Sequence, residues 1–155
     1  MENDFARRTW PTITASIAYL GIVFSAAFLL GVVRILIIAP WLGAMLAVMV
    51  ELPIVLAVSW VASRWAIQHY AVPDAITSRL AMGGLAFVML MVLELGMSVF
   101  MFKKSVSMYL ATFWTLPGAT GLLGQIGFAL IPCLQRQDIH CLLSKMGKLR
   151  AADKL

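Results

Sequence analysis

Four apolar runs dominate the sequence, and each is long enough to cross a membrane as a helix. A hydrocarbon layer about 30 Å thick requires a helix of about 20 apolar residues. The runs cover about residues 13–39, 42–65, 80–102 and 113–134. Only 12% of the residues are charged and 62% are hydrophobic, a balance that a soluble domain does not have. The sequence therefore predicts an all-α polytopic membrane protein, an up-down bundle of four transmembrane helices within residues 1–135.

Residues 31–53 are predicted to join the first two helices as a hairpin. They read GVVRILIIAPWLGAMLAVMVELP, with Arg34 before a Pro-Trp-Leu-Gly turn and Glu51 after it. Proline and glycine end one helix and allow the next to begin. We expect Arg34 and Glu51 to face each other below the membrane surface.

The basic residues predict the orientation of the bundle. With the N-terminus inside, nine Lys and Arg residues fall in the inner segments, and only Lys103 and Lys104 fall in the outer ones. By the positive-inside rule both termini are predicted to be cytoplasmic. The net charge of +5 is thus an orientation signal, and no nucleic-acid partner is expected. The first apolar run exceeds the core of a signal peptide and is expected to be retained.

Residues 136–155 form a second region, a basic tail that follows the last apolar run. Apolar residues recur there at helical spacing among basic ones: Ile139, Leu142, Leu143, Met146 and Leu149. This pattern favours an amphipathic helix on the anionic inner leaflet, and a frayed basic tail is the alternative. Cys133, His140 and Cys141 lack the spacing of a metal site, so neither metal nor cofactor is predicted.

Each apolar run contains one strongly polar side chain at a similar depth. At ~1.5 Å per residue, Arg34 lies about 9 Å from the outer end of its helix and Glu94 about 13 Å. Glu51 and Gln125 lie about 15 and 16 Å deep. Charges at such depths must face the bundle interior and find partners. We therefore group Arg34, Glu51, Glu94 and Gln125 into one cluster.

Neighbouring residues support the same grouping. Ser98 lies one turn from Glu94, and Gly121 shares the face of Gln125. Small residues let transmembrane helices pack closely, which places these faces inside the bundle.

Two interpretations of the cluster are open. In the structural one, Arg34 is held between Glu51 and Glu94, Gln125 completes the network, and the cluster organises the bundle. In the functional one, a single arginine cannot neutralise two glutamates, so one carboxylate could bind a proton, a cation or a small polar solute. No nucleophile–base pair accompanies the glutamates, so an enzyme is not expected.

Three segments carry a resemblance to known proteins: GVVRILIIAPWLG, VELPIVLAVSW and GLLGQIGFALIP. Over residues 30–135 the chain resembles an uncharacterised group of short four-helix bacterial inner-membrane proteins. The resemblance implies the topology and brings no substrate, cofactor or catalytic residue. The expected function is a small non-enzymatic membrane protein whose partner is the lipid bilayer. The alternative functions are an accessory subunit of a larger membrane complex and a small proton-coupled transporter. The possible protein partners are such a complex or further copies of this chain in a homo-oligomer.

Overall fold

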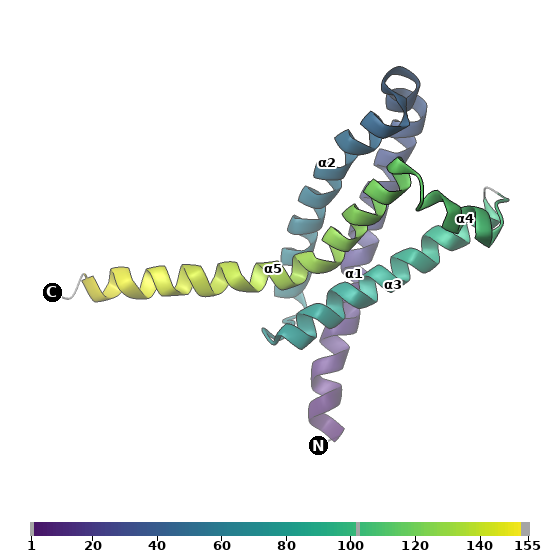
Figure 1. The fold of residues 1–155 in the computed structure, drawn as a ribbon. Coiled ribbons are helices and arrows are strands. Elements are labelled where there is room, and N and C mark those ends of the chain that lie inside the picture. Colours follow the sequence, from purple (N-terminus) through teal and green to yellow (C-terminus); the bar gives the residue numbers. More distant parts are fainter. Residues whose placement is uncertain (1, 102, 153–155) are drawn as a thin grey trace.

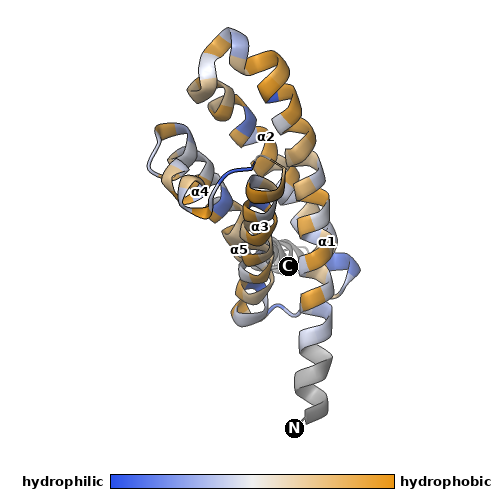
Figure 2. Ribbon diagram, turned by 90° about the vertical axis from the view of Figure 1, so that its right-hand side faces the viewer, coloured by the Kyte–Doolittle hydropathy of each residue, from blue (hydrophilic) through white to orange (hydrophobic). Residues whose placement is uncertain are grey.

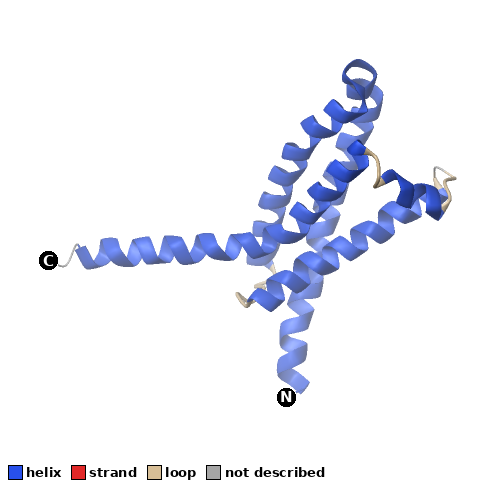
Figure 3. Cartoon of the chain, in the orientation of Figure 1, coloured by secondary structure: helices blue, strands red, loops and turns tan. Residues whose placement is uncertain are grey.

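The fold was described from a computed structural model, which covers the backbone of residues 2–101 and 103–152 and the side chains of residues 9–101 and 103–135. All the regular structure in these ranges is helical, as the sequence predicts, and no strand occurs in them (Figure 3). The helices are α1 (Glu2–Val33), the short π-helix η1 (Arg34–Ile38), α2 (Ala39–His69), α3 (Ile76–Phe100), α4 (Val106–Thr112) and α5 (Leu116–Ala152).

Three helical stretches are long and apolar enough to cross a membrane: Thr9–His69, Ile76–Phe100 and Leu116–Gln135. The first of them folds back on itself, as the sequence indicates. Gly43 has φ 79° and ψ 164°, a conformation that glycine adopts readily and other residues avoid. The chain reverses there, so that α1 and α2 run antiparallel as a hairpin (Figure 1). Most of their residues are hydrophobic (Figure 2), and many of their large hydrophobic side chains are exposed.

The last expected span, at about residues 113–134, corresponds to the first part of α5, and a further short helix precedes it. Residues 106–112 form this helix, α4. Ser105 precedes it as the N-cap residue, and its hydroxyl accepts a hydrogen bond of 3.3 Å from the Met108 amide. A turn then leads into α5 at Leu116. Helix α5 continues past the bundle to Ala152 (Figure 1). The side chains of the predicted amphipathic tail lie outside the described residues.

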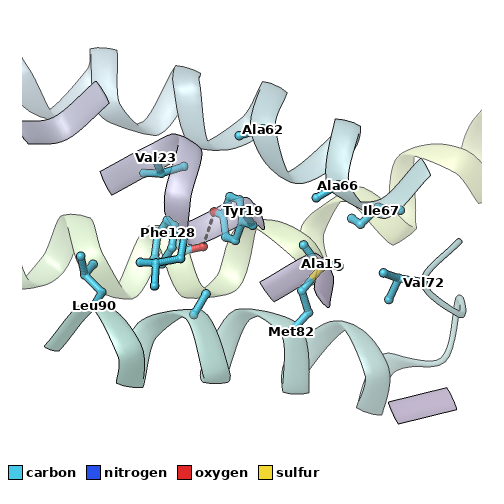
Figure 4. Close-up of a cluster of buried hydrophobic side chains, with 12 residues drawn as sticks. Ala15, Tyr19, Val23, Ala62, Ala66, Ile67, Val72, Met82, Leu90 and Phe128 are labelled. Atoms are coloured by element: carbon cyan, nitrogen blue, oxygen red, sulfur yellow. Dashed lines mark hydrogen bonds between the residues drawn. The ribbon is translucent and has the colours of Figure 1, made fainter. Parts of the chain in front are cut away.

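One end of the bundle is tightly packed, and we call the region around Tyr19, Ala62, Met82 and Phe128 the closed end (Figure 4). The Tyr19 and Phe128 rings stack with centroids 4.4 Å apart, and the Tyr19 hydroxyl donates a 2.8 Å hydrogen bond to the Phe128 carbonyl oxygen. Small residues allow this packing. A Cβ atom at Gly83 would collide with the Ala129 carbonyl oxygen, so only glycine allows α3 and α5 to approach this closely.

Gln135 is a buried polar residue at the closed end, and its side chain has partners within the protein. Buried Gln135 accepts a 3.1 Å hydrogen bond from the Ser63 hydroxyl and donates one of 2.6 Å to the Trp60 carbonyl oxygen. In a bilayer no water is available to satisfy such groups, so internal partners are required. These bonds tie α5 to α2.

Candidate ligand cavity

Arg34 and Glu51 form an ion pair across the hairpin. The Arg34 Nε atom lies 3.1 Å from Glu51 Oε2. The two residues are nearly the same number of positions from Gly43, so the antiparallel legs of the hairpin bring them side by side. Arg34 is also the first residue of η1, and π-helical turns often occur at functional sites because they redirect side chains. The pairing expected from the sequence is thus present in the structure.

Glu94 has a different environment. Gln125 Nε2 donates a 2.6 Å hydrogen bond to Glu94 Oε1, and the Tyr109 hydroxyl donates one of 3.2 Å to Glu94 Oε2. Both donors are uncharged. Arg34 attracts the Glu94 carboxylate through space, but no Lys or Arg nitrogen of the described residues makes a salt bridge with it. The structure therefore differs from the expected arrangement in which Arg34 is held between both glutamates.

Tyr109 is the member of this site that the sequence reasoning did not find. It lies on α4, in the connection between α3 and α5, and no periodicity of an apolar run marks it. Burial, the negative charge of Glu94 and the hydrogen bond to it raise the pKa of Tyr109 to about 12. The phenol thus stays protonated and able to donate a hydrogen bond at neutral pH. The available signal in the sequence was that Tyr109 closely follows Lys103 and Lys104, which end the third apolar run.

The four polar residues predicted from the sequence line one cavity of about 730 Å³. All of the described helices contribute to its wall, including α4 with Tyr109 and Thr112, and Phe113 directly after α4 lines it as well. Ser98 and Gly121, the two residues predicted to support the cluster, line it as well. The size is that of a small-molecule site. We call this half of the bundle the cavity end.

The rest of the wall is largely apolar, and the polar atoms are few. The Gln125 Oε1 atom is buried and has no hydrogen-bond partner among the described residues. Among the residues described, no group of three or more His, Cys, Asp or Glu side chains could hold a metal ion. The cavity thus combines an apolar wall with one ion pair and one carboxylate that has uncharged hydrogen-bond donors.

No protein-family model, curated protein or solved structure matches the chain. The function is therefore argued from the cavity.

Proposed function

We propose that this chain is a non-enzymatic integral membrane protein that binds a proton or a cation at Glu94. Four helical legs cross the membrane, two of them from the hairpin at Gly43, and both termini are cytoplasmic in a bacterial inner membrane. The paired Arg34 and Glu51 organise the bundle, and Glu94 is the residue that binds.

The observation that carries this proposal is that the carboxylates of Glu51 and Glu94 have different bonding partners. Glu51 has a guanidinium partner at 3.1 Å, whereas Glu94 is hydrogen-bonded by an amide and a phenol. A carboxylate within a membrane that lacks a bonded cation gains most from taking up a proton or a positively charged ligand. Glu94 also faces a cavity large enough for such a ligand.

Infrared titration of the reconstituted protein tests the proposal. The chain has seven Asp and Glu residues, so their carboxyl bands overlap on acidification. The band of Glu94 should be present in the unmodified protein and missing from Glu94→Gln. The matched control is Glu2→Gln, which removes a carboxylate before the first apolar run and should keep the band. An identical titration in Glu94→Gln and the unmodified protein would contradict the proposal.

A small proton-coupled transporter is one form of this function. It requires the cavity to be reached alternately from the two sides, and proteoliposomes with an imposed pH gradient test it. Solute uptake that follows the gradient and disappears in folded Glu94→Gln supports transport. Loss of assembly without a change in uptake points to a structural role.

The second candidate function is an accessory subunit of a larger membrane complex. It is favoured by Gly21 on α1 and Gly84 on α3, which have open space around them where another helix could approach closely. Purification in mild detergent tests it, because a subunit should elute as part of a stoichiometric complex. Replacement of Gly84 by Leu should then dissociate that complex, and a chain that elutes alone contradicts this candidate.

A further inference from the structure

The wall of the cavity suggests what kind of cation it holds. Aromatic side chains of α1 and of the α4 region line it within an otherwise aliphatic surface: Phe24, Phe28, Tyr109 and Phe113. The faces of aromatic rings attract cations that have lost their water. Met97 and Met101 add flexible side chains that adjust to ligands of different shape.

The rim of the cavity is also apolar. Four large hydrophobic side chains both line the cavity and are exposed, by 40 to 63%: Phe28, Val32, Ile35 and Met101. These side chains lie where a bilayer surrounds the protein. A ligand dissolved in the membrane could therefore enter between α1 and the end of α3, whereas a hydrated inorganic ion would meet an apolar rim. The rim thus favours a ligand that partitions into lipid.

The charges within the cavity favour a positive ligand. Of the charged side chains that line it, Arg34 and Glu51 neutralise each other. Lys104 lies beyond the end of α3, outside the apolar stretch that can cross the membrane. Glu94 is then the remaining charge within a membrane-crossing stretch. An inorganic divalent cation needs about six oxygen ligands, which the cavity does not supply.

We propose that the cavity binds a lipophilic organic cation, with its charged centre at Glu94 and its apolar groups against the aromatic wall. This proposal rests on the proposed function, because both assign binding to Glu94. It adds the chemical class of the ligand and the route by which the ligand enters.

Equilibrium dialysis of labelled tetraphenylphosphonium against the purified full chain in detergent tests the proposal. Saturable binding is expected above the level of empty micelles. Tetraphenylborate has the same shape and the opposite charge, and it should not compete. Tetramethylammonium has the charge without the apolar groups, and it should compete at least about tenfold more weakly, a difference of about 1.4 kcal/mol.

Two variants separate a binding role of Glu94 from a structural one. Glu94→Gln should weaken binding at least about tenfold, while the control variant Glu2→Gln should retain it. The double variant Glu94→Gln with Gln125→Glu moves the carboxylate to the partner across the 2.6 Å hydrogen bond and should restore binding. Gel filtration of each variant shows that it is folded.

The outcomes distinguish this inference from the proposed function. If Glu94 titrates in the infrared experiment and tetraphenylphosphonium does not bind, the ligand class is wrong and the proposed function stands. If Glu94 neither titrates nor affects binding, both are wrong. Equal binding of tetraphenylphosphonium and tetraphenylborate would mean that the cavity takes lipid-like molecules regardless of charge, which also overturns the inference.

Discussion

The two ends of the bundle are built from the same apolar helices but differ in how closely these helices approach. At the closed end, alanines and Gly83 let the backbones meet, and the Tyr19 ring stacks on Phe128. At the cavity end, the α1–α2 hairpin and α3 with α4 leave about 730 Å³ between them. Polar groups mark this difference. At the closed end, the side chains of Tyr19 and Gln135 tie helices together through hydrogen bonds, whereas Glu94 at the cavity end faces open space.

This contrast indicates that the closed end stabilises the bundle and that the cavity end is suited to binding. Close packing at one end supplies the dispersion contacts that hold transmembrane helices together, because lipid offers no hydrophobic driving force between them. The other end can then keep a cavity and a buried carboxylate, both of which cost stability. Changes at the two ends should therefore have different consequences.

The largest effect is expected at Gly83. Gly83→Ala places a methyl group against the Ala129 backbone carbonyl, so α3 and α5 must separate. We expect a loss of about 3 kcal/mol in unfolding free energy, measured by SDS titration in mixed micelles. Gly84→Ala is the matched control, since its Cβ meets nothing within 4 Å. That variant should gain about 0.5–1 kcal/mol. Equal changes in the unfolding free energy of the two variants would contradict the close approach of α3 and α5 at Gly83.

The next effect concerns the ion pair at the cavity end. Arg34→Leu leaves Glu51 without its partner, and we expect a loss of about 2 kcal/mol in the same titration. The double variant Arg34→Leu with Glu51→Leu removes both charges and should recover most of this loss. A double variant as unstable as the single one would show that the arginine acts through contacts other than the pair.

A smaller effect is expected at the hydrogen bond of Tyr19. Tyr19→Phe keeps the ring stack on Phe128 and leaves the buried Phe128 carbonyl without the 2.8 Å bond. The expected loss is about 1 kcal/mol of unfolding free energy. Binding of tetraphenylphosphonium should not change, because the bond lies at the closed end. Weaker binding in this variant would mean that the two ends are coupled.

The smallest effect concerns Tyr109 and appears only at alkaline pH. Because the folded-state pKa of Tyr109 is raised to about 12, above its usual value near 10, folding favours the protonated phenol. The stability from this group is fully present below pH 10 and is lost as the pH rises through 12. Tyr109→Phe should therefore flatten the fall in melting temperature between these pH values. An unchanged alkaline slope would contradict the contact with Glu94.

Part of the site was predictable because it is local. Arg34 and Glu51 lie on the two legs of one hairpin, so the position of Gly43 largely determines that they meet. The depths of Glu94 and Gln125 placed them at one level, and they are indeed bonded. Depth alone does not give the rotation of a helix, so whether Arg34 would bond one glutamate or both could not be read from the sequence. Tyr109 was missed because it reaches the cavity from a connection.

Composition and spacing were sufficient for the helical fold, the reversal at Gly43 and the presence of one strongly polar side chain in each apolar run. These features depend on properties of the chain that act over a few turns of helix: hydrophobic length, glycine conformation and residue rise. Only the tertiary structure decided that Glu94 is bonded by an amide and a phenol instead of a guanidinium, and that an open cavity lies before it. Both depend on how far the helices separate beyond the contact of Gly83 with Ala129. Packing between distant segments sets that separation.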